Sequence, residues 1–140
     1  MARYCLHRFD GDEAPVVADP KGTYDLHERT AVLGEEVIDL AKKLRKDNVN
    51  RVLVSQVVRS ATSIGANYAE ADGAGSKREF RHRIGLCRRE AKETMHWLRM
   101  LAKANEDRVQ ESRRLWQEAH ELALIFSAIL RSAESKAGNK

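Results

Sequence analysis

The 140-residue sequence predicts an all-α protein, an up-down-up-down antiparallel four-helix bundle with an irregular N-terminal arm. Both prolines lie before residue 23, and because proline breaks helix interiors, the remaining chain is free to be helical. Four successive segments then repeat apolar residues at alternating spacings of four and three, the 3.5-residue period of bundled helices. We therefore expect one bundle over 23–136, an arm at 1–22 and a tail at 137–140.

Short polar or glycine-containing turns separate the four periodic segments. Their apolar positions span residues 26–44, 53–71, 80–101 and 115–133. Connections this short place consecutive helices antiparallel. We expect helices of about 23 to 30 residues, or roughly 35–45 Å at 1.5 Å per residue.

Capping residues mark where the helices begin. Asp47 and Asn48 can end the first helix and start the second. Ser76 precedes Glu79 by three residues, the capping-box pattern that satisfies free N–H groups at a helix start. Asp107 stands in the turn before the fourth segment, where we expect it to be the N-cap.

Composition narrows the classes of function. Apolar residues make up 42% and charged residues 33%, which suits a folded chain rather than a disordered one. The longest apolar run, 122–130, is far shorter than the roughly 20 residues that span a bilayer, so we expect no membrane partner. The N-terminus carries no apolar signal region, which favours a cytoplasmic protein. The net charge of +4 weakly favours a polyanionic partner.

No pattern typical of an enzyme or a metal site is present. Glu-x-x-His spacings run from Glu93 to His96 and from Glu79 to His82, both in the third segment, whereas ferritin-like bundles hold metals with such motifs on facing helices. Cys5 and Cys87 lack metal-site spacing, and Cys87 falls on the apolar seam, where a small buried thiol is expected. The sequence contains no glycine-rich phosphate loop, HExxH or GxSxG motif. We expect no catalytic residue, no cofactor and no metal.

Polar residues interrupt the apolar seam of the second segment. Ser60 and Asn67 occupy positions that should face the core, and Arg59 flanks them. Because buried polar groups are costly unless paired, we expect a buried hydrogen-bonded cluster between the second and third helices, made of Arg59, Ser60, Asn67 and Glu93. Its expected role is to fix helix register, as a seam asparagine does in coiled coils. A ligand-binding pocket is the alternative.

A second weakly polar row runs beside that seam, from Val54 to Tyr68. A helix that is apolar on two sides either widens its contact with its own bundle or faces a neighbouring subunit. Small side chains let another helix approach closely. We therefore expect a subunit contact that includes Ala61, Gly65, Ala66, Tyr68 and Ala69.

The third segment carries a one-sided positive charge. Residues 76–104 contain nine basic and three acidic side chains, a net charge of +6. Seven of the basic residues fall on adjacent outward rows of the helix, and we call them the basic stripe: Arg78, Arg81, Arg88, Arg89, Lys92, Arg99 and Lys103. Many spaced cations on one rigid face favour binding to a phosphate backbone. The absence of aromatic residues from these rows gives no support for base stacking.

Two other interpretations of the basic stripe remain open. A run of charge is usually a solvated helix face. If the stripe instead lay in a subunit interface, its cations would pair with acidic groups such as Glu111, Glu118 and Glu121.

Two segments resemble a known protein family. Residues 56–71, QVVRSATSIGANYAEA, are similar to the Q-x-x-R-S-x-x-S-I-x-x-N-x-x-E segment of the four-helix bundle proteins named for 23S rRNA intervening sequences. Residues 79–98 resemble a segment of that family that begins with E-F and ends with E-T-x-x-W-L. The two matches lie in the right order and at the right distance, and the first and fourth helices agree in length and pattern.

The resemblance implies a bundle that assembles as a ring-like homopentamer, with no catalytic residue to carry over. Some members are encoded inside intervening sequences of bacterial 23S rRNA genes. A related branch, the accessory variability proteins of diversity-generating retroelements, consists of basic pentamers that bind nucleic acid and a reverse transcriptase. This chain departs from the pattern at Gly65, where many members have proline, and in its 1–22 arm.

Two functional hypotheses follow. The first is a non-enzymatic homopentamer that binds RNA or DNA through the basic stripe. The second is a protein-interaction scaffold that recruits a partner protein and has no physiological nucleic-acid ligand. The charge of the stripe favours the first hypothesis. The modest overall charge and the lack of base-reading aromatic residues keep the second one open.

Overall fold

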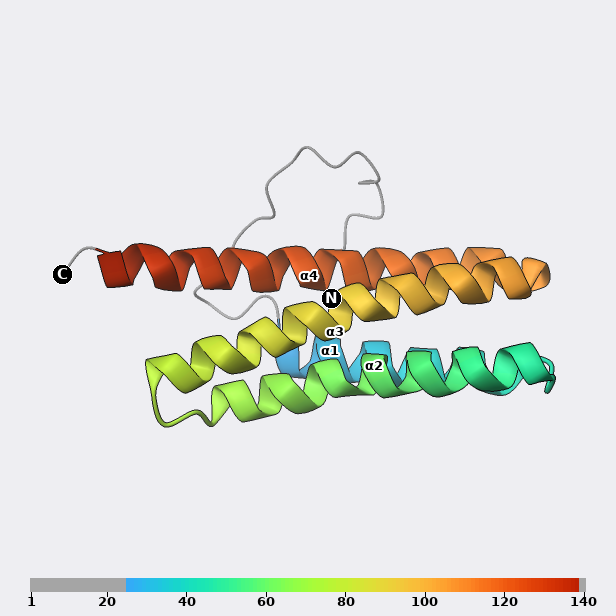
Figure 1. Ribbon diagram of the computed structural model, residues 1–140, viewed down its shortest axis with the longest axis horizontal. Helices are drawn as coiled ribbons and strands as arrows, with labels where there is room; N and C mark the ends of the chain where they lie inside the picture. Colours follow the sequence, from blue (N-terminus) through green and yellow to red (C-terminus); the bar gives the residue numbers. More distant parts are fainter. Residues whose placement is uncertain (1–24, 139–140) are drawn as a thin grey trace.

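Four long helices lie side by side as a bundle in the computed structural model (Figure 1). The structure describes the backbone of residues 25–138 and the side chains up to residue 134. The elements are α1 (Leu26–Lys43), α2 (Asn48–Asp72), α3 (Lys77–Ala104), the short 3-10 helix η1 (Glu106–Arg108) and α4 (Val109–Gly138). The predicted all-α fold is confirmed. The expected arm at 1–22 lies outside the described residues.

The helices differ in length and in how closely they pack. α1 contains 18 residues, fewer than expected, whereas α2, α3 and α4 contain 25, 28 and 30. The expectation for α1 was wrong because its helix starts directly at its first seam residue, Leu26, with Asp25 as N-cap. α3 packs extensively against both α2 and α4, while among neighbouring helices α1 and α4 pack least closely.

The apolar seams form the core as predicted. Val57, Ile64, Ile84, Leu98 and Phe126 are completely buried. The seam positions that are only half-buried lie mostly near helix ends, where fewer neighbours cover them. Each buried apolar side chain contributes about 1.5–3 kcal/mol, and the seams of all four helices meet in one hydrophobic cluster.

Two of the predicted caps are confirmed. Asp47 accepts a hydrogen bond from the Asn50 N–H at 2.7 Å, and Ser76 Oγ accepts from the Glu79 N–H at 3.1 Å. The Glu79 carboxylate accepts in return from the N–H of Gly75 at 3.1 Å. In the usual capping box this carboxylate binds the N–H of the N-cap itself. At α3 it binds the N–H of Gly75, the residue before the N-cap Ser76.

The turn between α3 and α4 differs from the prediction. Asp107 lies inside η1 and is not the N-cap of α4, because the chain makes a 3-10 turn before the α-helix begins. The buried residue in this turn is Asn105, whose side-chain amide pairs reciprocally with that of Asn50 in α2, at 2.9 and 2.8 Å. Asn50 also donates to the Arg45 carbonyl, and Asn105 to that of Leu101. This amide pair ties the α3–α4 turn to the start of α2.

Glycines allow α1 and α2 to approach closely. A Cβ atom added at Gly34 would lie 3.6 Å from the Thr62 Cα atom, and one added at Gly65 would lie 3.3 Å from the Thr30 Oγ1 atom. Thr30 has little room to move, because it is buried and its hydroxyl donates to the Leu26 carbonyl at 2.6 Å. The weakly polar row of α2 is thus used, at this point, for contact with α1 of the same chain.

Replacing Gly65 with leucine is expected to lower the free energy of unfolding by about 1–3 kcal/mol, because the added side chain overpacks the contact with Thr30. Gly85 in α3 provides a matched control, since a Cβ atom there would meet nothing within 4 Å. Gly85→Leu is expected to leave stability unchanged or to raise it by up to about 1 kcal/mol, by removing a glycine from a helix interior. Equilibrium urea unfolding measures both. Equal effects would contradict the close approach of α1 and α2.

Candidate nucleic-acid interface

The basic stripe covers the solvent side of α3. The core side of this helix is buried through residues such as Ile84 and Leu98. Five residues of the stripe are exposed and two are half-buried, the latter being Arg81 and Arg88. From Arg78 to Lys103 the stripe extends over about 38 Å at 1.5 Å per residue.

Most cations of the basic stripe form no ion pair with the described residues. Arg81 forms an ion pair with Glu134 of α4, with 2.9 Å between Nη2 and Oε1. Among the described residues, none of the other six stripe cations lies in an ion pair. The stripe is therefore mostly unneutralised within the described part of the chain.

Arg29 of α1 binds Glu118 and Glu121, two of the three acidic residues named above as possible partners of the basic stripe. Its Nε atom lies 2.6 Å from Glu118 Oε1, and its Nη2 atom lies 3.0 Å from Glu121 Oε1. Burial of Arg29 lowers its pKa, but the hydrogen bonds and charges of the two glutamates outweigh this effect and raise the pKa above the usual value. Arg29 therefore stays protonated and holds both carboxylates on the α1 side of α4.

Two further pairs continue this line of contacts. Lys43 Nζ lies 3.1 Å from Glu111 Oε1, and Arg114 Nη1 lies 2.7 Å from Glu36 Oε2. We call these pairs, with those of Arg29, the α1–α4 ladder. All three acidic residues that the sequence suggested as partners of the stripe belong to the ladder, and none of them contacts a stripe cation.

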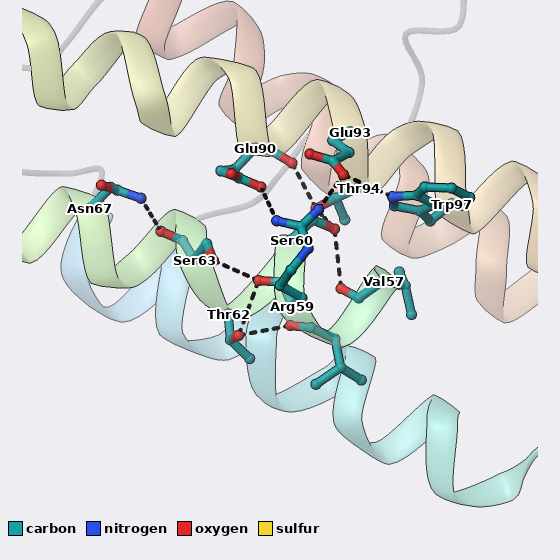
Figure 2. Close-up of polar contacts among 11 residues, drawn as sticks. Val57, Arg59, Ser60, Thr62, Ser63, Asn67, Glu90, Glu93, Thr94 and Trp97 are labelled. Carbon is teal, nitrogen blue, oxygen red and sulfur yellow. Dashed lines mark hydrogen bonds and ion pairs between the residues drawn. The ribbon is translucent and has the colours of Figure 1, made fainter. Parts of the chain in front are cut away.

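Figure 2 shows that the polar contacts between α2 and α3 are linked through Glu90, whose carboxylate binds Arg59 and whose backbone carbonyl accepts from Thr94 Oγ1 at 2.8 Å. Arg59 binds Glu93 and also Glu90, the latter at 3.3 Å, and Glu93 accepts a hydrogen bond from Trp97 Nε1 at 3.2 Å. The Arg59 side chain is 47% exposed. The prediction that Arg59 is buried was wrong, because its long side chain lies at the surface and binds half-buried Glu93 and buried Glu90 from there.

The buried contact involves Ser60 and Thr94. Thr94 Oγ1 donates to Ser60 Oγ at 2.9 Å, and both residues are completely buried. Asn67 is half-buried and apart from them, because it donates to the Ser63 carbonyl at 2.9 Å and accepts from Arg83 at 3.3 Å. The predicted membership of Asn67 in the cluster is therefore wrong.

Sequence reasoning missed Glu90 and Thr94 as partners in these contacts. Thr94 was a visible signal, since it is a polar residue on the otherwise apolar seam of α3. Assigning its partner requires the register between α2 and α3, which the spacing within one helix does not give.

The five residues expected in a subunit contact differ in how exposed they are in the structure. Ala61 is completely buried within one chain and cannot contact another subunit, so its assignment was wrong. Gly65 faces α1, and Tyr68 is half-buried, with burial as the main cause of its raised pKa. Ala66 and Ala69 are exposed. A subunit contact on this side of α2 stays a prediction that rests on the exposed alanines.

Cys87 lies in the core, as expected. Its thiol is 3.6 Å from the Ile64 carbonyl, and burial raises its pKa to about 12. Within the described residues, no group of three or more His, Cys, Asp or Glu side chains is placed to hold a metal ion. Nor does that part of the chain contain a helix long and apolar enough to cross a membrane.

The Cys87 thiol is expected to resist alkylation in the folded protein, because the reactive species is the thiolate. In a Cys5→Ser variant Cys87 is the sole thiol. Its reaction with iodoacetamide at mildly alkaline pH should be slower by roughly a hundredfold or more when folded than in urea. Burial raises the pKa of the Cys87 thiol from 9.0 to about 12 in the folded state, so ionisation of this thiol favours unfolding. The free energy of unfolding should therefore fall as the pH rises from the unfolded pKa to the folded one, and this loss is absent at lower pH. Equal alkylation rates in the two states would contradict the burial.

Comparison with known proteins agrees with the resemblance in α2 and α3. A family model described as 23S rRNA-intervening sequence protein matches residues 23–128. A solved structure, that of a protein of unknown function from the S23 ribosomal protein family of Bacteroides thetaiotaomicron, is 26% identical, with a TM-score of 0.69. The match covers 75% of this chain and 97% of that one. No curated protein matches. The matched range contains α1, α2, α3 and most of α4, so this chain belongs to the family of 23S rRNA-intervening sequence proteins.

Proposed function

We propose that this chain is a non-enzymatic, homo-oligomeric protein that binds nucleic acid through the basic stripe of α3. The observation that carries the proposal is the separation of charge around this helix. Six of the seven stripe cations have no acidic partner among the described residues, whereas the nearby glutamates are engaged elsewhere.

The acidic residues of α3 itself are directed away from the stripe. Glu79 accepts a hydrogen bond from the backbone of Gly75, and Glu90 and Glu93 bind Arg59 of α2. The stripe therefore meets little opposing charge from its own helix. Cations spaced along a rigid helix release the counterions of a phosphate backbone when they bind it, which favours association without sequence preference.

Assembly would strengthen this binding. Several copies of a weak phosphate-binding face act together when they are held in one oligomer, provided that all of them meet the same ligand. The resemblance to the family implies five subunits. Ala66 and Ala69, exposed on α2, are small enough for a helix of another subunit to approach closely.

A protein-interaction scaffold is the second candidate function. Val49 and Val52 at the start of α2 are 59% and 58% exposed, which is high for apolar side chains. They lie about one helical turn apart and therefore on the same side of α2. A partner protein is the ligand that such an exposed apolar pair favours.

Reversing two charges of the stripe is expected to remove most nucleic-acid binding. We expect Arg88→Glu with Lys92→Glu to abolish most of the affinity for labelled RNA and DNA in a fluorescence anisotropy titration. The affinity of the unmodified protein should fall steeply with salt, because each neutralised phosphate contributes about −0.7 to −0.9 to the slope of log K against log salt.

Lys42 of α1 and Arg51 of α2 provide the matched control for this experiment. Both are exposed, lie outside α3, and form no ion pair with the residues that the structure describes. Lys42→Glu with Arg51→Glu changes the net charge equally and should retain most of the binding. An equal loss in both variants would show that net charge alone matters. No binding at low salt by the assembled protein would favour the scaffold.

Multi-angle light scattering is expected to give a mass several times that of the 140-residue chain, with five copies as the specific expectation. Ala66→Glu with Ala69→Glu should lower that mass and leave helicity unchanged, because both positions are exposed in the single chain. A monomeric mass at micromolar concentration would contradict assembly.

A further inference from the structure

A cavity lies at the end of the bundle where the α1–α2 turn and the α3–α4 turn come together (Figure 1). Its volume is about 240 Å³, and its lining residues are Lys43, Leu44, Arg45, Asn105 and Asp107. The first three belong to the end of α1 and the turn after it, and the other two to the turn between α3 and α4. The amide pair of Asn105 with Asn50 ties these turns together, at 2.9 and 2.8 Å. A ligand in the cavity would therefore meet two walls from different parts of the chain.

The wall from the end of α1 presents hydrogen-bond donors that are not in use. Lys43 Nζ lies 3.1 Å from Glu111 Oε1, and this bond uses one of the three N–H groups of the ammonium. Arg45 is exposed, and its guanidinium forms no ion pair with the residues that the structure describes. Because a guanidinium presents its donors as a fork that matches two oxygens of a phosphate, this wall suits a phosphate group.

The wall from the α3–α4 turn presents a carboxylate. The side chain of Asp107 is 81% exposed, and its recorded contact is with Arg108, at 3.9 Å between Oδ2 and Nε. That distance is too long for a hydrogen bond. Arg108 Nη1 also lies 3.9 Å from Glu111 Oε2, so one further positive charge is close to both acidic residues. An ionised carboxylate only accepts hydrogen bonds, and this wall therefore suits a ligand group that donates them, such as a hydroxyl.

We propose that the cavity binds the ribose phosphate of a ribonucleotide. The phosphate accepts hydrogen bonds from Lys43 and Arg45, and the 2′- and 3′-hydroxyls of the ribose donate to Asp107. A carboxylate holds the ribose 2′-hydroxyl in the same way in dinucleotide-binding folds. The cavity is smaller than the roughly 300–1,000 Å³ of pockets for drug-sized ligands, so the base stays outside and the site reads no sequence.

This site goes beyond the proposed function, because no residue that lines the cavity belongs to the basic stripe. Two sources share the ligand chemistry. A free ribonucleotide and the 3′ end of an RNA strand both carry a phosphate together with a free 2′- and 3′-hydroxyl. The 2′-hydroxyl is absent from DNA, so a DNA end lacks half of the contact with Asp107.

Isothermal titration calorimetry with three matched compounds tests both halves of the site. Adenosine monophosphate should bind, since it carries the phosphate and both hydroxyls. Adenosine lacks the phosphate, and 2′,3′-dideoxyadenosine monophosphate lacks the hydroxyls. Each of these two should bind roughly tenfold more weakly or worse, because each loses hydrogen bonds to a charged side chain. Equal affinity for all three compounds, or no binding of adenosine monophosphate at millimolar concentration, overturns the ribose-phosphate site.

Variants of the two walls should have different signatures. Arg45→Ala should weaken binding of adenosine monophosphate roughly tenfold. Lys46→Ala is the matched control, because Lys46 is exposed beside Arg45 and does not line the cavity. Asp107→Asn should weaken binding of adenosine monophosphate and leave that of the dideoxy compound unchanged, a selectivity that damage to the fold would not produce. Equal effects of Arg45→Ala and Lys46→Ala overturn the site.

Competition by RNA distinguishes the two sources. The measurement is made at high salt, where binding through many phosphates is weakened most. If the ligand is an RNA end, a short RNA with a free 3′ end displaces adenosine monophosphate, and the same RNA ending in a 2′,3′-dideoxy residue does not. If neither RNA displaces it, the cavity takes the free ribonucleotide. Failure of the cavity to bind any of these probes leaves salt-dependent binding by the basic stripe unaffected, so the two proposals fail separately.

Discussion

The α1–α4 ladder is the interaction on which the distribution of charge in this protein depends. α1 and α4 approach each other least among neighbouring helices, so long charged side chains bridge them. Arg29 is the central member, with a side chain only 2% exposed and two carboxylates within 3.0 Å of its guanidinium. Removing a partner from a buried pair of this kind is costly, because the remaining charge is left uncompensated. The ladder therefore joins α1 to α4 and also holds Glu111, Glu118 and Glu121 on the side of α4 that faces α1.

The contacts of Arg59 have the same effect on the other side of α3. They hold Glu90 and Glu93 towards α2, as Figure 2 shows, and so separate the acidic flank of α3 from its basic one. Neither arrangement changes the net charge of the chain. Together they concentrate positive charge on the α3–α4 surface, where a modest overall charge of +4 can still produce a strong local field.

The sequence predicted well what each helix determines by itself and less well what depends on two helices together. The buried seam follows from the spacing within a segment, and caps such as Asp47 and Ser76 depend on residues three positions away. The partners of Ser60 and the exposure of Arg59 depend on the register of α2 against α3.

The close approach of α1 and α2 narrows the possible subunit contacts. The small residues of α2 that face α1 already pack within the chain. At Gly65, for example, an added Cβ atom would lie only 3.3 Å from the Thr30 Oγ1 atom of α1. The remaining small residues on this side, Ala66 and Ala69, lie on the outer surface of α2. A subunit contact there would involve a part of α2 that contains no residue of the basic stripe. Several stripes can act together on one nucleic acid provided that assembly leaves them facing the same ligand.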